Sequence, residues 1–166
     1  MNPAVSRRTV AYVGLGANLG DPHGTLLASV HEMDALPDTR VIAVSSHYRT
    51  APMEAFGPDF INAVVRLDTE LDAHALLLQL QRIESAHGRE RPFVNAPRTL
   101  DLDLLLFGDE RIDTPTLIVP HPRLHQRAFA LAPLAELAPD AVIPGIGPVA
   151  VALEAVADQR IDRLTA

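Results

Sequence analysis

The amino-acid sequence predicts an α+β protein with a ferredoxin-like β-α-β-β-α-β core and an antiparallel sheet, extended by a short strand and C-terminal helices. Two observations lead to this prediction. Stretches with apolar residues at helical spacing alternate with β-rich stretches, and capping or turn-forming residues separate them. In this order of elements, both core helices pack on one face of the sheet.

The first half of the core is expected to be a strand, a helix and a second strand. Residues Thr9 to Leu15 are β-rich and end in glycines. Asp21 and Pro22 supply an N-cap and a first-turn proline for the helix, which Pro37 closes. Residues Val41 to Tyr48 form the next β-rich stretch. The apolar face of the helix consists of Leu26, Leu27, Val30 and Met33.

The second half of the core repeats this pattern. Residues Phe60 to Leu67 predict a strand, with Ile61, Ala63, Val65 and Leu67 on one face. Asp72 caps the second helix and Gly88 ends it. The last core strand lies within Pro97 to Gly108. The apolar face of the helix consists of Leu76, Leu77, Leu80 and Ile83.

The rest of the chain extends this core. We expect a short strand over Leu117 to Val119, a helical stretch broken by proline over Arg127 to Leu137, and a final helix over Val149 to Gln159. Two connections, Arg49 to Asp59 and Arg89 to Pro97, are long for a compact domain. Long connections are usually functional or disordered, so these two are candidates for binding loops.

The composition limits the classes of function. The chain has 166 residues, 48% of them hydrophobic, which suits a single domain over residues 1–166. A formal charge of −7 disfavours binding to nucleic acid or to an anionic membrane that is driven by the net charge of the protein. Every basic residue is arginine, so a Walker A phosphate loop and Schiff-base chemistry are excluded. Cysteine is absent, which excludes disulfides and cysteine-based metal sites.

The N-terminal sequence SRRTVAYVGLG has paired arginines, as a twin-arginine signal does. Its apolar stretch is short and lacks a small-residue cleavage site, so we interpret it as the first strand. No stretch of the sequence reaches membrane-spanning length, and no coiled-coil pattern is present. The expected protein is cytoplasmic and monomeric.

Two aspartates in the last core strand point to chemistry. Asp101 and Asp103 lie on one face of the strand, roughly 6–7 Å apart by strand rise. Leu105 and Phe107 continue that face, while Leu100, Leu102, Leu104 and Leu106 form the other. A strand face turned to water would also tolerate aspartate, but aspartate is depleted in strands. Paired carboxylates in apolar surroundings resist ionisation unless a cation lies between them, which favours a Mg²⁺ site shared with substrate phosphates.

Arginines cluster in sequence beside this pair. Surface charge is the simpler explanation for arginines, and it fits the residues at the chain ends, Arg7, Arg8, Arg160 and Arg163. The others suit a phosphate clamp, because guanidinium groups bind phosphate oxygens in a bidentate manner. Carboxylates, magnesium and arginines together indicate phosphoryl-type transfer. The clustered arginines are Arg82, Arg89, Arg91, Arg98, Arg123 and Arg127.

Weaker signals surround these residues. Gln81 and Glu84 share a helix face near the predicted site, although exposed helix polarity explains them equally well. His121 lies between prolines and near arginines, which suits either a structural role or phosphate contact. Phe60 and Asn62 share a strand face and could hold a flat heterocycle, although Phe60 also suits a core.

The sequence GLGANLGD lacks the spacing of a dinucleotide-binding loop. We interpret Gly14, Gly16 and Gly20 as turn formers, and Asn18 as a residue that braces a loop through hydrogen bonds.

Several of these stretches together resemble the 6-hydroxymethyl-7,8-dihydropterin pyrophosphokinase family of folate biosynthesis. The resemblance runs from about Val10 to about Asp140, through GLGANLGD, SSHYRTAPM, FINAVV, QRIESAHGRERP, PRTLDLDLLLFG and VPHPRLHQRAFALAPLAELAP. It implies a ferredoxin-like fold and the transfer of pyrophosphate from ATP to the hydroxymethyl group of the pterin, with release of AMP.

The resemblance also implies roles for individual residues. Asp101 and Asp103 would bind two Mg²⁺ ions that bridge the ATP phosphates and the attacking hydroxyl, and Arg89 and Arg98 would steady the phosphates. The loops around residues 50–58 and 88–98 would close over the substrates. The implied ATP site comprises Gln81, Glu84, Arg91, His121 and Arg127, with the Leu104 backbone and Thr116 near the adenosine. The implied pterin pocket comprises Thr50, Met53, Phe60, Asn62 and Phe129, with rings stacking from both sides.

The chain departs from the family pattern at a few positions. Val94 and Asn95 stand where the family often has an Arg-Trp pair, in a loop one residue shorter. Phe60 replaces a frequent tyrosine, which keeps the stack without the hydroxyl, and Pro122 replaces a frequent aromatic residue.

Two other functions remain compatible with the residues alone. Another two-metal nucleotidyl or phosphotransferase would use the same aspartate pair but attack a different phosphorus atom. A non-catalytic ligand-sensing module would use the same fold without chemistry, since fold does not fix function.

Overall fold

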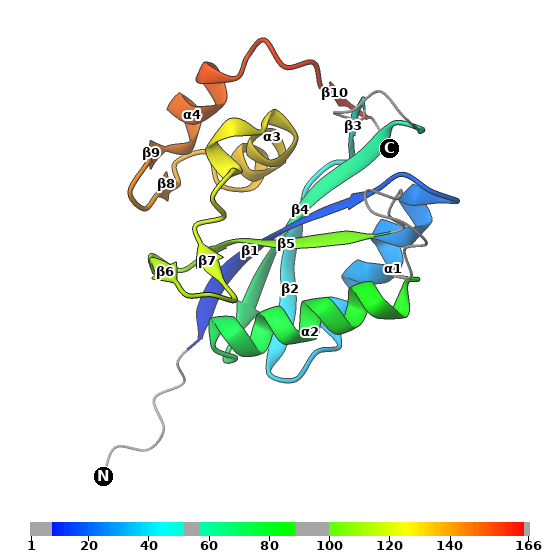
Figure 1. Ribbon diagram of the computed structural model, residues 1–166, viewed down its shortest axis with the longest axis vertical. Helices are drawn as coiled ribbons and strands as arrows, with labels where there is room; N and C mark the ends of the chain where they lie inside the picture. Colours follow the sequence, from blue (N-terminus) through cyan, green and yellow to red (C-terminus); the bar gives the residue numbers. More distant parts are fainter. Residues whose placement is uncertain (1–7, 52–56, 89–99, 165–166) are drawn as a thin grey trace.

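The computed structural model describes residues 8–51, 57–88 and 100–164 (Figure 1). Its core elements are β1 (Thr9–Ala17), α1 (Pro22–Asp34), β2 (Thr39–Val44), β3 (Tyr48–Thr50), β4 (Phe60–Thr69), α2 (Ala73–Ala86) and β5 (Asp101–Phe107). The later elements are β6 (Ile112–Asp113), β7 (Ile118–Val119), a 3₁₀ turn (Leu124–Gln126), α3 (Ala128–Leu137), β8 (Val142–Ile143), β9 (Gly147–Pro148), α4 (Val149–Ala155) and β10 (Asp162–Arg163).

The main sheet is antiparallel with the order β10-β3-β4-β1-β5, and β2 also pairs with β4. The predicted ferredoxin-like order of the core strands is confirmed. The single strand expected over Val41 to Tyr48 is wrong, because this stretch divides into β2 and β3. At the division, the Ser45 backbone N–H donates to the Val64 carbonyl, and the Val64 N–H donates to the Ser45 hydroxyl, both at 2.9 Å.

The helix boundaries follow the predicted capping signals. The Asp21 carboxylate accepts a hydrogen bond from the Gly24 N–H at 3.1 Å, and Asp72 accepts one from the Ala75 N–H at 2.7 Å. Gly88, with φ of 86°, follows the end of α2 as expected. One position of the apolar face of α1 was wrong: Leu27 is 54% exposed, so it points away from the core.

Helices cover both faces of the sheet (Figure 1). The face that carries Val13, Leu15 and Val65 packs against α1 and α2. The opposite face packs against α3 and α4 through a second apolar cluster that includes Val64, Leu105 and Leu131. Both apolar clusters therefore use the sheet as their shared wall.

The C-terminal helices differ from expectation. Helix α3 continues through Pro133, which is buried, so the expected break is absent. Helix α4 ends at Ala155 rather than at Gln159. Among the described residues, no helix is both long and apolar enough to cross a membrane.

Strand β5 contains a bulge that the period-two pattern did not predict. Tyr12 pairs with Leu106 and Val13 with Leu104, so Leu105 has no partner on β1. The alternation shifts at this point: Leu106 lies in the cluster beneath α3, and Phe107 lies in the cluster beneath α1 and α2. The expectation that Leu106 shares a face with Leu102 is therefore wrong.

The second apolar cluster should contribute strongly to stability. Leu131→Ala removes a fully buried side chain of α3 and should lower the free energy of unfolding by about 2–5 kcal/mol, because a cavity adds to the lost burial. Leu78→Ala, at a 49% exposed position of α2, is the matched control and should change it by less than about 0.5 kcal/mol. Urea titration measures both. Equal values for the two variants would contradict the assignment of α3 to the core.

Candidate functional site

Asp101 and Asp103 lie side by side on the sheet face that α3 and α4 cover only in part. Asp101 pairs with Gly16 and Asp103 with Gly14 on β1, so no β1 side chain stands beside either carboxylate. The glycines are thus strand residues, and their interpretation as turn formers was wrong for Gly14 and Gly16. Both aspartates are partly exposed and have interaction partners in the structure. The alternation Val13-Gly14-Leu15-Gly16 is the signal that places both glycines on the site face.

Glu84 links helix α2 to the strand that carries the aspartates. Its carboxylate accepts a hydrogen bond from the backbone N–H of Leu102 at 2.8 Å, and Leu102 is the residue between Asp101 and Asp103. Strand β5 is an edge strand, so this bond occupies an N–H on its outer side. Glu84 therefore helps to fix the backbone of the aspartate pair. Gln81 lies on the same helix and is exposed.

Basic side chains face the carboxylates from the segment before α3. The His121 Nε2 lies 3.9 Å from the Asp103 Oδ1. The His121 Nδ1 accepts a hydrogen bond from the Arg123 N–H at 3.2 Å, which assigns the proton of the neutral ring to Nε2, the nitrogen that faces Asp103. Burial lowers the pKa of His121; Asp103 opposes this effect, while Arg127 and Arg123 add to it.

Arg127 lies near enough to both aspartates for their charges to act on it. Burial lowers its pKa, and the charges of Asp103 and Asp101 oppose that change. Its guanidinium lies over the Phe129 ring, with Cζ 5.4 Å from the ring centroid. Arginine stays protonated in proteins, so this side chain brings a permanent positive charge to the carboxylate pair.

A hollow of about 290 Å³ opens beside the pair, between β5, α2 and the turn at residues 114–117. The Thr114 hydroxyl accepts from the Leu117 N–H at 3.0 Å, which fixes this turn. The structure thus places four of the predicted residues around one space: the hollow is lined by Asp103, Leu104, Thr116 and His121, among others.

The residues expected around the pterin lie on β3, β4 and α3. Thr50 pairs with Phe60, and Asn62 donates a hydrogen bond from Nδ2 to the Thr50 hydroxyl at 2.9 Å. Asn62 is buried and leans over Gly16, where an added Cβ would lie 3.1 Å from its Oδ1. The glycine therefore lets Asn62 on β4 and Asp101 on β5 face the same space. Phe129, partly buried, lies in the first turn of α3.

Asn18 braces the end of the first long connection, as expected. Its Nδ2 donates to the Pro58 carbonyl at 3.3 Å, while its buried Oδ1 has no hydrogen-bond partner among the described residues. Met53 of the expected pterin pocket lies outside the described residues. Five other positions named in the sequence analysis also lie outside them: Arg89, Arg91, Val94, Asn95 and Arg98.

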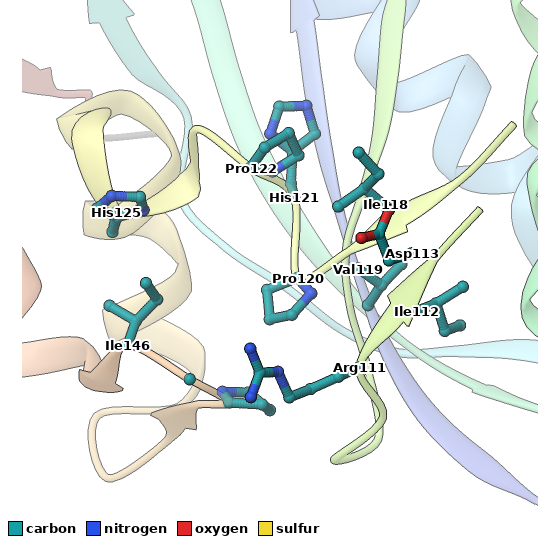
Figure 2. A pocket seen from close by; sticks show the side chains of 12 residues that line it. Arg111, Ile112, Asp113, Ile118, Val119, Pro120, His121, Pro122, His125 and Ile146 are labelled. Carbon is teal, nitrogen blue, oxygen red and sulfur yellow. The ribbon is translucent and has the colours of Figure 1, made fainter. Parts of the chain in front are cut away.

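A second hollow of about 250 Å³ lies on the other side of the 118–122 segment. Figure 2 shows Arg111 on one side of Pro120 and the His121 ring on the other. Of the residues predicted for the site, only His121 lines this hollow in the part of the chain that is described. Of the arginines clustered in sequence, the described ones, Arg82, Arg123 and Arg127, do not line this hollow.

The donor set at the aspartate pair suits magnesium. No group of three or more histidine, cysteine, aspartate or glutamate residues able to hold a metal occurs among residues 8–51, 57–88 and 100–164. Two carboxylates leave most positions of an octahedral ion to other ligands, and Mg²⁺ typically fills such positions with substrate phosphates and water. The residues present therefore fit an ion that is held jointly with a phosphorylated substrate.

Comparison with known proteins identifies close relatives of the chain. It is 48% identical over 134 residues to 2-amino-4-hydroxy-6-hydroxymethyldihydropteridine pyrophosphokinase of Pseudomonas aeruginosa, which covers 80% of this chain and 83% of the relative. It is 39% identical over 155 residues to the enzyme of the same name from Haemophilus influenzae, which covers 93% and 97%.

Solved structures show the same fold. A Plasmodium falciparum HPPK-DHPS structure with pteroate matches 95% of this chain with a TM-score of 0.74 and 13% identity. The chain spans only 44% of that longer chain. At this identity the likeness concerns the fold alone.

A family model completes the comparison. The model described as 7,8-dihydro-6-hydroxymethylpterin-pyrophosphokinase (HPPK) matches residues 12–139, a range that begins within β1 and includes β2 to β5, the aspartate pair and all of α3. The chain therefore belongs to the 7,8-dihydro-6-hydroxymethylpterin-pyrophosphokinase family.

Proposed function

We propose that the open part of the sheet face is the active site at which this chain, as a pyrophosphokinase of folate biosynthesis, transfers pyrophosphate from ATP to the hydroxymethyl group of 6-hydroxymethyl-7,8-dihydropterin. The observation that supports this location best is the pair Asp101 and Asp103, opposite two glycines and beside a hollow of about 290 Å³. AMP is the other product.

Asp101 and Asp103 are the proposed ligands of two magnesium ions. Bound there, magnesium neutralises phosphate charge and brings the ATP phosphates and the acceptor hydroxyl together. The carboxylates hold their positions because Glu84 fixes the Leu102 backbone between them. The positive charge of Arg127, which interacts with both, reduces the repulsion between them.

The nucleotide is proposed to lie in the hollow along β5. Leu104 and Thr116 line it on the adenosine side, while His121 and Arg127 face the phosphates. A neutral His121 with its proton on Nε2 donates a hydrogen bond toward an oxygen between itself and Asp103. The same proposal gives Gln81, Glu84 and Arg91 to the ATP site, and Arg89 and Arg98 to the transferring phosphates.

The pterin is proposed to bind between Phe60 on β4 and Phe129 on α3. Asn62 and Thr50, already joined by a hydrogen bond, offer an amide and a hydroxyl to the edge of a flat ring. Met53 completes the proposed pocket. Gly16 lies between Asn62 and the aspartates and has no side chain that would keep the substrates apart. In this proposal the pterin edge and the ATP phosphates therefore meet over β1.

The proposed reaction is one displacement at the β-phosphorus of ATP. The pterin hydroxyl oxygen forms a bond to that phosphorus, the bond to the α,β-bridging oxygen breaks, and AMP leaves with the electron pair. The hydroxyl releases its proton to solvent water as this bond forms. The side chains contribute positioning and charge neutralisation, which supply most of the catalysis in such transfers. A monomer, a cytoplasmic location and a single domain over residues 1–166 stay predictions.

The products distinguish this function from its alternatives. Incubation of the protein with ATP, Mg²⁺ and the reduced pterin should yield AMP and a pyrophosphorylated pterin in equal amounts, measured by chromatography and mass spectrometry. ADP would indicate a simple kinase, and free pyrophosphate would indicate a nucleotidyl transferase. An absence of turnover with retained ligand binding would favour a sensing module.

Neutralising one aspartate should abolish turnover but leave the fold intact. Asp101→Asn or Asp103→Asn should lower kcat by at least about a hundredfold, because a proposed ligand of the magnesium that neutralises the reacting phosphates is lost. The melting temperature should stay equal or rise, because a like-charged neighbour is removed. Asp109→Asn, in the exposed turn after β5, is the control and should retain activity. A sharply lower melting temperature would assign the pair a structural role instead.

Removal of magnesium should abolish binding of the nucleotide. Binding of a non-hydrolysable ATP analogue, followed by calorimetry, should be lost with EDTA and restored by Mg²⁺, because two carboxylates repel bare phosphates. The Asp101→Asn,Asp103→Asn variant should bind the analogue with much weaker dependence on Mg²⁺. Equal binding by the wild type with and without Mg²⁺ would contradict the metal assignment.

A further inference from the structure

Glu136, near the end of α3, connects this helix to the sheet edge beside the proposed pterin pocket. Its carboxylate accepts hydrogen bonds from the Ser46 N–H at 2.9 Å and from the Tyr48 hydroxyl at 2.7 Å. The Arg163 guanidinium of β10 lies 3.6 Å from it, and the Arg163 Nε donates to the Ser46 hydroxyl at 3.1 Å. One carboxylate thus joins α3, the β2–β3 division, β3 and β10.

These contacts lead directly to residues proposed for the pterin. Tyr48 pairs with Asn62, and two residues along the same strand Thr50 pairs with Phe60. On α3, Phe129 and Glu136 are seven residues apart, so they lie on the same side of the helix, about 10 Å apart along its axis. Strand β3, which Glu136 contacts through Tyr48, therefore forms one wall of the proposed pocket. Helix α3, which carries Glu136 and Phe129, forms the other wall.

The environment of the carboxylate makes this connection strong. Burial raises the pKa of Tyr48 to about 12, with the Glu136 hydrogen bond and charge adding to the effect. Burial acts to raise the pKa of Glu136, but hydrogen bonds from Tyr48 and Ser46 and the charge of Arg163 outweigh it, so that pKa is lowered. At neutral pH the pair is therefore a carboxylate that accepts from a protonated phenol. Hydrogen bonds to charged groups contribute more than neutral ones.

The other side-chain contacts at this end of α3 leave this task to Glu136. Beyond it, the Arg66 guanidinium donates to the Leu137 carbonyl and to the Tyr12 hydroxyl, which fixes the last turn of the helix on the sheet. Neither contact reaches β3. Among the described residues, the side-chain hydrogen bonds between α3 and the β2–β3 region are all made by Glu136.

We propose that Glu136 is a positioning residue for the pterin: by tying α3 to Ser46 and Tyr48, it sets the spacing between the Phe129 wall and the Thr50–Asn62 wall. The inference rests on the proposed function, because it concerns the pterin pocket of that same site. It extends that function to a residue that touches neither substrate. A role in stability alone would lower the melting temperature without distinguishing the two substrates.

Steady-state kinetics on three variants test the proposal. Glu136→Ala should raise the KM for the pterin about tenfold, Tyr48→Phe about threefold, and Glu136→Gln the least, because glutamine retains one acceptor oxygen. The KM for ATP should change by less than about twofold in each variant. Asp34→Asn is the matched control: Asp34 on α1 also accepts from a strand N–H, that of Val41 at 2.9 Å, but on the other side of the sheet.

The outcomes separate this inference from the function on which it rests. A pterin-selective KM change in Glu136→Ala that Glu136→Gln largely rescues supports the positioning role, as does a non-additive Glu136→Ala,Tyr48→Phe double variant. Equal changes in both KM values, or a lower melting temperature with unchanged KM values, overturn it. If Glu136→Ala does not fold, the same readouts on Tyr48→Phe and Glu136→Gln decide. If the wild type forms no AMP and no pyrophosphorylated pterin, the proposed function itself fails, and the inference with it.

Discussion

The repulsion between two neighbouring carboxylates is the constraint on which the site depends. Two unit charges 6–7 Å apart repel by about 2–3 kcal/mol at the effective dielectric of a protein surface. The structure accepts this cost in a strand whose other residues are all apolar. It then surrounds the pair with features that reduce the cost or make it useful: Arg127 faces both charges, and Gly14 and Gly16 leave the space beside them open. A site that binds cations together with its substrate benefits from two negative charges held this close together.

Helices α3 and α4 cover only part of the second face of the sheet, which leaves room there for the two aspartate side chains. The face beneath α1 and α2 is filled by apolar side chains, so neither aspartate could point there without a large desolvation penalty. On the opposite face, α3 is held at both ends. The Gln159 Oε1 accepts from the Ala128 N–H at 2.9 Å at its start, and Glu136 and Arg66 fix its end. The helix thus packs over Val64 and Leu105 but leaves the neighbouring part of the face open.

Local patterns in the sequence predicted much of this arrangement. The caps at Asp21 and Asp72 and the alternation in β4 were readable because each depends on neighbouring residues. The aspartate pair was found for the same reason, since an acidic residue in an apolar strand conflicts with its local surroundings. The split of Val41 to Tyr48 was missed because it depends on Ser45 bonding to Val64 across the sheet. Glu136 gave no signal either, because a glutamate in a helix is ordinary until its partners Ser46 and Tyr48, about 90 positions away, are known.

The bulge at Leu105 explains how one short strand serves both as core and as site. With strict alternation, Leu106 would point toward α1 and α2, and Leu105 and Phe107 would continue the face of the aspartates. Because of the extra residue, the consecutive residues Leu105 and Leu106 both lie in the cluster beneath α3, and Phe107 lies in the cluster beneath α1 and α2. It also leaves Leu105 unpaired with β1, and its carbonyl accepts the His121 N–H at 3.0 Å instead. That bond holds the His121 segment within 3.9 Å of Asp103. A single inserted position therefore adds Leu106 to the core beneath α3 and places the His121 side chain at the carboxylate pair, which is a physical reason for a bulge beside the proposed active site.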